Sequence, residues 1–153
     1  MVSNVVVELV RASRVSELDK EKRGDDRRIG RDVFQRETLL DLQQAVGESA
    51  RETGKLHLHD ALEYRKTGSW GTALIGNEHG ERERLAILRL ALLESRVADE
   101  ALRESVGRYR EAAAVGMAKD ESSSNEAMDD ASEIATAILE RAGELIRDTF
   151  VRE

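Results

Sequence analysis

Apolar residues recur every three to four positions through most of this chain, which is the spacing of one face of an α-helix. The pattern is sustained over residues 28–66, 81–118 and 123–151, and the stretches between them are rich in glycine or charge. We therefore predict an all-α fold, an antiparallel bundle of three to four helices. The second, third and fourth helices are expected to be long.

The first two segments are less regular. Residues 1–19 are predicted to form an N-terminal helix or arm, with Val6 and Leu9 on one side of it. Three consecutive valines at residues 5–7 also fit a buried strand, so both interpretations stay open. Residues 20–27 are mostly charged and include a glycine, and we interpret them as a linker.

The predicted helix over residues 28–66 changes character along its length. Its main stripe passes from large side chains to small ones: Ile29, Val33, Leu40, Gly47, Gly54 and Ala61. Each interior glycine costs about 1 kcal/mol relative to alanine. Two explanations stay open: either a second helix packs closely against the small residues, or the helix breaks near Gly54.

A loop with four glycines is predicted over residues 67–80. A helix is predicted after this loop, over residues 81–118, with its first turn near Asn77. Between residues 85 and 93 this helix is apolar almost all round, so its first half must pack against neighbours on several sides. Its heptad-like seam, typical of a coiled coil, comprises Leu85, Leu88, Leu92, Leu102, Val106, Tyr109 and Ala113. The seam of the last helix comprises Ala131, Ile134, Ile138, Ala142 and Leu145.

Composition narrows the class of protein further. The 153 residues fit a single domain, contain no proline and no cysteine, and carry a formal net charge of -7. Without cysteine there is neither a disulfide framework nor thiolate chemistry. No apolar run approaches the length of a membrane span and no signal-peptide pattern opens the chain. We expect a protein that is cytoplasmic or carried within a macromolecular particle, and that does not enter a membrane.

The histidines give the only metal-like spacing. His57, His59 and Glu63 stand as H-x-H-x-x-x-E, with His79 further along. This spacing resembles the first half of the cupin metal motif, and the resemblance implies a transition metal with His79 as a further ligand. The flanking sequence is helical, however, whereas cupins are all-β, and residues two apart on a helix point in nearly opposite directions. We predict no cofactor and no metal site, with these four residues as weak candidates.

No motif points to catalysis. The chain lacks a Gly-x-Ser-x-Gly elbow, a phosphate-binding glycine loop with its lysine, and the Glu-x-x-His motif of di-metal bundles. No catalytic residue is proposed, and the protein is predicted not to be an enzyme.

A cluster of basic residues occurs in this otherwise acidic chain. Residues 20–36 contain seven basic and four acidic side chains, a local excess of positive charge. Arg27, Arg28 and Arg31 are weak candidates for contacting nucleic acid or an acidic partner. The net charge of the chain disfavours nucleic acid.

We therefore predict a non-enzymatic helical structural or assembly subunit that acts through protein–protein contacts, with a homo-oligomer or another helical protein as its partner. One alternative is a subunit of a nucleoprotein complex that uses the arginine cluster, and another is a metal-dependent enzyme that uses the histidine cluster. The residues expected at helix-packing or interface positions are Val6, Leu9, Leu85, Leu88, Leu92, Leu93, Ile134, Ile138 and Leu145.

Overall fold

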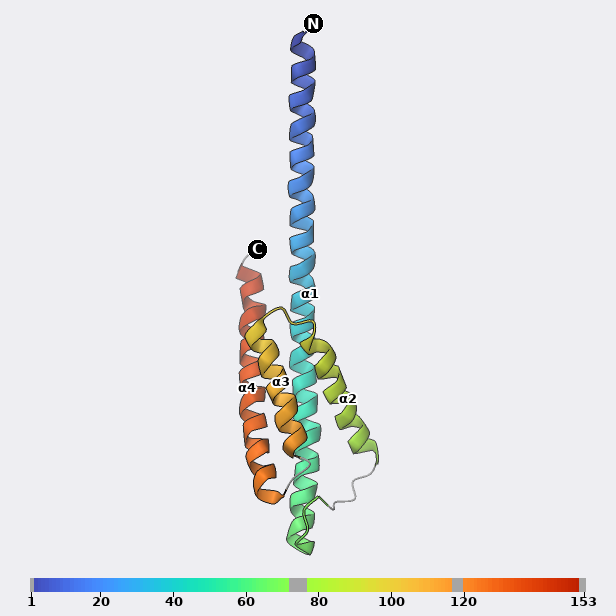
Figure 1. Cartoon of the computed structure of the whole chain (residues 1–153), viewed down its shortest axis with the longest axis vertical. Coiled ribbons are helices and arrows are strands. Elements are labelled where there is room, and N and C mark those ends of the chain that lie inside the picture. Colours follow the sequence, from blue (N-terminus) through green and yellow to red (C-terminus); the bar gives the residue numbers. More distant parts are fainter. Residues whose placement is uncertain (1, 72–76, 117–119, 152–153) are drawn as a thin grey trace. The chain divides into compact units, whose positions relative to one another are not determined.

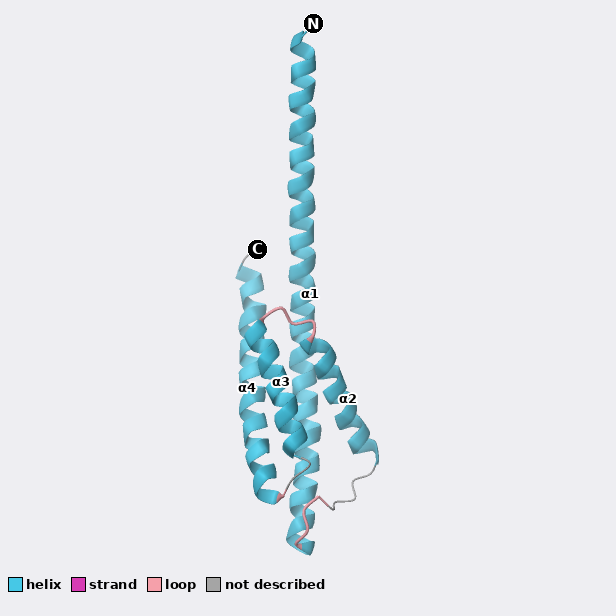
Figure 2. Ribbon diagram, viewed as in Figure 1, coloured by secondary structure: helices cyan, strands magenta, loops and turns pink. Residues whose placement is uncertain are grey.

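The computed structural model describes the backbone of residues 2–71, 77–116 and 120–151, and the side chains of residues 14–71, 78–116 and 120–150. Over these residues the chain forms four helices and no strand: α1 (Val2–Thr67), α2 (Asn77–Glu94), α3 (Glu100–Gly116) and α4 (Glu121–Val151) (Figures 1 and 2). The predicted all-α fold is confirmed. The chain divides into two compact units, Met1–Phe34 and Gln35–Glu153, and the single domain that the sequence pattern predicts stays a prediction.

The first unit is helical over all of its described residues. Of the two interpretations of residues 1–19, the structure has the helix. The predicted linker over residues 20–27 is wrong, because these residues lie inside α1. Lysine, arginine and glutamate are good helix formers, and local contacts add to this: Arg28 pairs with Asp25 at 3.5 Å, and Arg27 Nε donates to the Arg23 carbonyl at 3.0 Å.

Every described side chain from residue 14 to residue 34 is exposed. Val6 and Leu9 lie outside the residues whose side chains are described, so their predicted packing role stays a prediction.

In the second unit, α1 continues without a break through Gly54 and ends at Thr67. The predicted close packing is also not seen, because a Cβ added at Gly47 or Gly54 would meet no atom within 4 Å. The helix ends with Gly68 at a φ of +73°, where the Gly68 amide donates to the Tyr64 carbonyl at 2.7 Å. A glycine in the left-handed region is a common helix stop, since it lacks the Cβ that opposes this conformation.

The core of the second unit is made of aliphatic and alanine side chains from all four helices, with Tyr109 as its largest fully buried member. The predicted inward faces of α3 and of much of α4 are seen, although Ile134 and Leu145 are only partly buried. The buried core residues are Leu39, Leu42, Ala45, Val46, Leu90, Leu93, Val97, Leu102, Val106, Tyr109, Ala113, Ala131, Ala135, Ile138 and Ala142.

The predicted single helix over residues 81–118 is wrong, because it is divided into α2 and α3. Asp99 Oδ1 accepts the Leu102 amide at 2.8 Å and so caps the start of α3. The connection is also held from α1. The Gln35 side chain donates to the Arg96 carbonyl at 2.9 Å and accepts from the Ala98 amide at 2.9 Å.

The fourth helix begins two residues before its predicted start at residue 123. Asp120 is its cap, since its Oδ1 accepts the Ser123 amide at 3.0 Å. Hydrogen bonds from Ser123 lower the pKa of Asp120. Over the described residues, none of the helices is both long enough and apolar enough to cross a bilayer.

Candidate interaction surface

The outward face of α2 carries an apolar stripe. Leu85, Leu88 and Leu92 are 58%, 51% and 62% exposed. They were predicted to line the seam of the bundle, and for this chain's own core that prediction is wrong. The apolar residues that α2 buries are Ala86, Leu90 and Leu93.

The physical reason is the composition of α2 itself. Between residues 85 and 93 leucines stand on two sides of the helix, so the leucine pattern alone fits either orientation. The exposed triplet follows the i, i+3, i+7 spacing of a coiled-coil seam. Its predicted role as an interface stays a prediction.

Two arginines of α2 border this stripe on one side. Arg82 and Arg89 stand seven residues apart, which places them one above the other, about 10 Å apart, on the helix surface, and Arg96 follows in the turn after the end of α2 at Glu94. Arg82 pairs with Glu78 at 3.5 Å. Arg89 Nη1 lies 3.0 Å from Glu48 Oε2 of α1.

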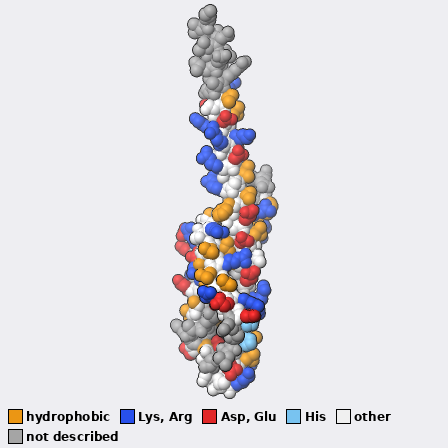
Figure 3. Space-filling model, turned by 90° about the vertical axis from the view of Figure 1, so that its right-hand side faces the viewer, with side chains coloured by type: hydrophobic (Ala, Val, Ile, Leu, Met, Phe, Trp, Pro, Cys, Tyr) orange, Lys and Arg blue, Asp and Glu red, His pale blue; other side chains and the backbone are white. Residues whose placement is uncertain are grey.

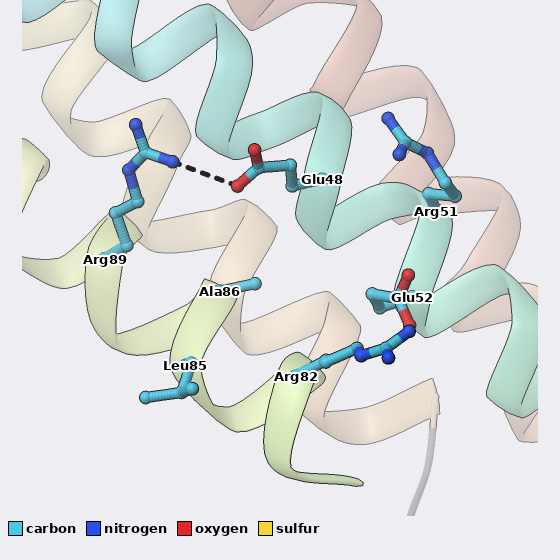
Figure 4. A pocket seen from close by; sticks show the side chains of 7 residues that line it. All are labelled: Glu48, Arg51, Glu52, Arg82, Leu85, Ala86 and Arg89. Carbon is cyan, nitrogen blue, oxygen red and sulfur yellow. Dashed lines mark hydrogen bonds and ion pairs between the residues drawn. The ribbon is translucent and has the colours of Figure 1, made fainter. Parts of the chain in front are cut away.

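An open groove lies between α1 and α2 beside the stripe, with a cavity volume of about 270 Å³. Figure 4 shows Glu48 and Arg89 turned toward each other across it. The groove is lined by Glu48, Arg51, Glu52, Arg82, Leu85, Ala86 and Arg89. Seen from the side of α2, hydrophobic side chains lie among charged ones on the second unit (Figure 3).

Beneath the stripe, the buried side of α2 faces a layer of polar groups. The Tyr109 hydroxyl of α3 lies 3.1 Å from Ser49 Oγ of α1. Burial raises the pKa of Tyr109. Glu83 of α2 is 7% exposed, and desolvation raises the pKa of its carboxyl. The contact between Tyr109 and Ser49 ties α3 to α1.

The predicted metal candidates are not brought together as one set. His59 and His79 are neighbours, with ring centroids 6.4 Å apart. His57 Nδ1 instead lies 3.1 Å from Ser124 Oγ, and Glu63 lies 3.5 Å from Lys66 Nζ. In the part of the chain that the structure describes, no three His, Asp or Glu side chains form a group that could hold a metal ion.

His79 and His57 make other contacts. His79 Nδ1 lies 3.5 Å from Glu52 Oε2, and the Lys55 ammonium, 2.8 Å from Glu52 Oε1, lowers the pKa of Glu52. The His57 ring packs at 5.4 Å, centroid to centroid, on Trp70. This arrangement links α1 to the connection that follows it.

The basic cluster lies on the first unit. Arg27, Arg28 and Arg31 are all exposed, and Arg28 is turned to its ion pair with Asp25. Arg27 and Arg31 border, with Gly24, a shallow hollow of about 420 Å³. Lys and Arg side chains are prominent along this part of α1 (Figure 3).

The sequence analysis did not single out Arg82, Arg89 and Arg96. The signal was their seven-residue repeat beside the leucines, which was hidden because those leucines were expected to be buried. Comparison with models of known protein families, with curated proteins and with solved structures finds no match to this chain. The interpretation of these surfaces therefore rests on their own chemistry.

Proposed function

We propose that this chain is a non-enzymatic helical structural or assembly subunit that acts through protein–protein contacts, in the cytoplasm or within a macromolecular particle. Its partner is a second copy or another helical protein. The observation that carries the proposal is the exposed leucine stripe of α2, at Leu85, Leu88 and Leu92. A contiguous apolar stripe rimmed by charged residues is typical of an interaction surface.

The free energy that is gained by covering the three leucines supports a helix as the partner of this stripe. Covering the exposed half of one leucine side chain contributes on the order of 1 kcal/mol. Three leucines at coiled-coil spacing act together, because a partner helix covers all of them at once. The groove between α1 and α2 adds a recess for a partner side chain next to Leu85.

We also propose that the bundle is antiparallel. Two contacts between α3 and α4 support this arrangement. The Ser124 hydroxyl, near the start of α4, donates to the Gly116 carbonyl at the end of α3. Further along α4, Arg141 lies 2.8 Å from Asp99, which caps the start of α3.

The test is the molar mass of the purified chain by light scattering over a range of concentrations. We expect a mass above the 17.1 kDa of one copy. Replacing Leu85, Leu88 and Leu92 together by serine is expected to return the mass to that of one copy, because the apolar contact is lost.

A matched control is Leu58→Ser on α1, since Leu58 is exposed to the same extent as Leu85, 58%. This variant is expected to keep the wild-type mass. Circular dichroism of each variant checks that the helices are retained. A folded wild-type protein that stays at one-copy mass at all concentrations would contradict the proposal of self-assembly.

A second candidate function is contact with nucleic acid in a nucleoprotein complex. It is favoured by the hollow that Gly24, Arg27 and Arg31 border on the first unit. Binding of duplex and single-stranded oligonucleotides would then weaken steeply with salt, and replacing Arg27, Arg28 and Arg31 by glutamate would abolish it. Replacing the exposed Arg65 and Lys66 by glutamate is the control. Binding that survives the triple change would exclude this function for the cluster.

A further inference from the structure

The described part of the first unit has an apolar face of its own. Val15, Leu18, Ile29 and Val33 are 58%, 63%, 57% and 50% exposed. Their separations of three, eleven and four residues are all close to whole helical turns, so they lie along one side of α1. Lys22 falls on the same side, between the two apolar pairs.

Aspartates border this face on both sides. Asp19 and Asp26 follow one edge and Asp25 and Asp32 follow the other, and each pair is seven residues apart. The side chains of all four are exposed. We call residues 14–34, with this apolar and aspartate-bordered face, the arm.

The arm and α2 are therefore complementary. The arm presents branched aliphatic side chains bordered by aspartate, and α2 presents leucines bordered by Arg82 and Arg89, with the same seven-residue spacing in both borders. Antiparallel pairing of α2 with α2 would set the two arginine borders side by side, and pairing arm with arm would set aspartate borders side by side. Like charges in such positions oppose association, so the mixed pairing is the favoured one.

The arm also needs a partner. A helix whose described side chains are all exposed is marginal in water, because most helical stability in proteins comes from packing an apolar face. Gly24 and Gly30 lower its intrinsic propensity further.

We propose that the arm of one copy of this chain packs along the Leu85, Leu88 and Leu92 stripe of a second copy, with its aspartates facing the arginines of α2. This inference rests on the proposed function and deepens it by naming the partner. Reciprocal exchange between two copies closes a dimer, and exchange in one direction only produces longer assemblies.

The test is a charge exchange in the full chain. One variant carries Asp19→Arg and Asp26→Arg on the arm, and the second carries Arg82→Asp on α2 and Arg96→Asp in the turn that follows α2, which leaves the ion pair of Arg89 with Glu48 in place. Each is expected to raise the dissociation constant of self-association at least about tenfold, since attraction is replaced by repulsion. The variant with all four changes is expected to recover wild-type association, because the opposite charges meet again.

The control is Glu133→Arg with Glu140→Arg on α4. These two exposed acids have the same seven-residue spacing, and their reversal changes the net charge by the same amount. We expect this variant to associate as well as the wild type. If it loses association as strongly as the arm variant, the effect is one of net charge and the inference is overturned.

The outcomes separate the inference from the proposed function. A wild-type protein that associates while the arm variant associates equally well overturns the inference and leaves the proposed function standing. Failure of the four-change variant to recover also overturns it. A wild-type protein at one-copy mass, including one whose arm docks within its own chain, overturns both.

Discussion

The buried carboxyl of Glu83 lowers the stability of the fold when it is ionised. It is 7% exposed, and desolvation raises the pKa of its carboxyl. Because the folded chain binds this proton more tightly than the unfolded chain, the free energy of unfolding falls as the pH rises through the ordinary glutamate range and up to the raised value.

We expect Glu83→Gln to increase the free energy of unfolding at pH 7 by about 1 kcal/mol and to flatten its decline as the pH rises above the ordinary glutamate pKa. Urea unfolding at a series of pH values measures both effects. Glu140→Gln, at an exposed position on α4, is the matched control and is expected to change little. A destabilised Glu83→Gln protein at pH 7 would show that the ionised carboxyl has a stabilising partner instead.

The glycines inside α1 provide a second prediction at this scale. A Cβ at Gly47 or Gly54 meets nothing within 4 Å, so alanine fits without displacement. We expect Gly54→Ala to increase the free energy of unfolding by about 1 kcal/mol through helix propensity. Gly68→Ala is the comparison: at a φ of +73° it is expected to be destabilising. Thermal unfolding of both variants measures the difference, and the same sign for both would contradict it.

At the scale of the elements, the end of a helix depends on capping side chains more than on its apolar pattern. Asp99 caps α3 and also meets Arg141 of α4. The hydrogen bond from Arg141 is the main cause that lowers the pKa of Asp99, and the Leu102 amide adds to it. The stabilisation is therefore present above the ordinary aspartate pKa and is lost as the pH falls through the lowered value.

We expect Asp99→Ala to lower the free energy of unfolding by about 1–2 kcal/mol at pH 7 and to reduce the loss of stability in acid. Asp99→Asn retains a capping oxygen and is expected to lose less. Chemical unfolding of the two variants at pH 7 and pH 3 provides the comparison. Equal losses in Asp99→Ala and Asp99→Asn would mean that the cap contributes nothing.

The apolar periodicity was sufficient to predict that the chain is all helical and which faces of α3 and α4 turn inward, at Leu102, Val106 and Ile138. It did not show the break between α2 and α3, where Gln35, 61 residues before Arg96, hydrogen-bonds the connection, because such a distant contact leaves no trace in a local pattern. Residues 20–27 were misread because charge and glycine suggested a linker, whereas their arginines and lysines are good helix formers.

The candidate site was predicted in part. The excess of apolar residues between residues 85 and 93 indicated that α2 requires cover on several sides, and the structure leaves one of those sides exposed. Which leucines remain outside could not be predicted, because both sides of α2 are leucine-rich and the choice depends on the shape of the core that α1 and α3 form. The arginines can be recognised as the border of an exposed stripe only when the orientation of α2 is known.

At the scale of the whole molecule, the proposed pairing of arm and α2 predicts a dependence on salt. Screening weakens attraction between exposed charges beyond a Debye length of about 10 Å at 0.1 M ionic strength. We expect the dissociation constant of the wild-type assembly to rise with sodium chloride concentration between about 0.05 and 0.5 M. The variant with Arg82→Asp and Arg96→Asp is expected to show the opposite trend, since salt screens repulsion there. Light scattering at each salt concentration measures both, and an identical response would contradict the charge pairing.

The proposed assembly requires that the leucine face of α2 is covered by another chain. Sedimentation equilibrium of the full wild-type chain tests this most directly, because the mass follows without assumptions about shape. We predict a mass that rises with concentration above the 17.1 kDa of one copy. A mass of one copy at every concentration, from a protein whose circular dichroism is fully helical, would contradict it.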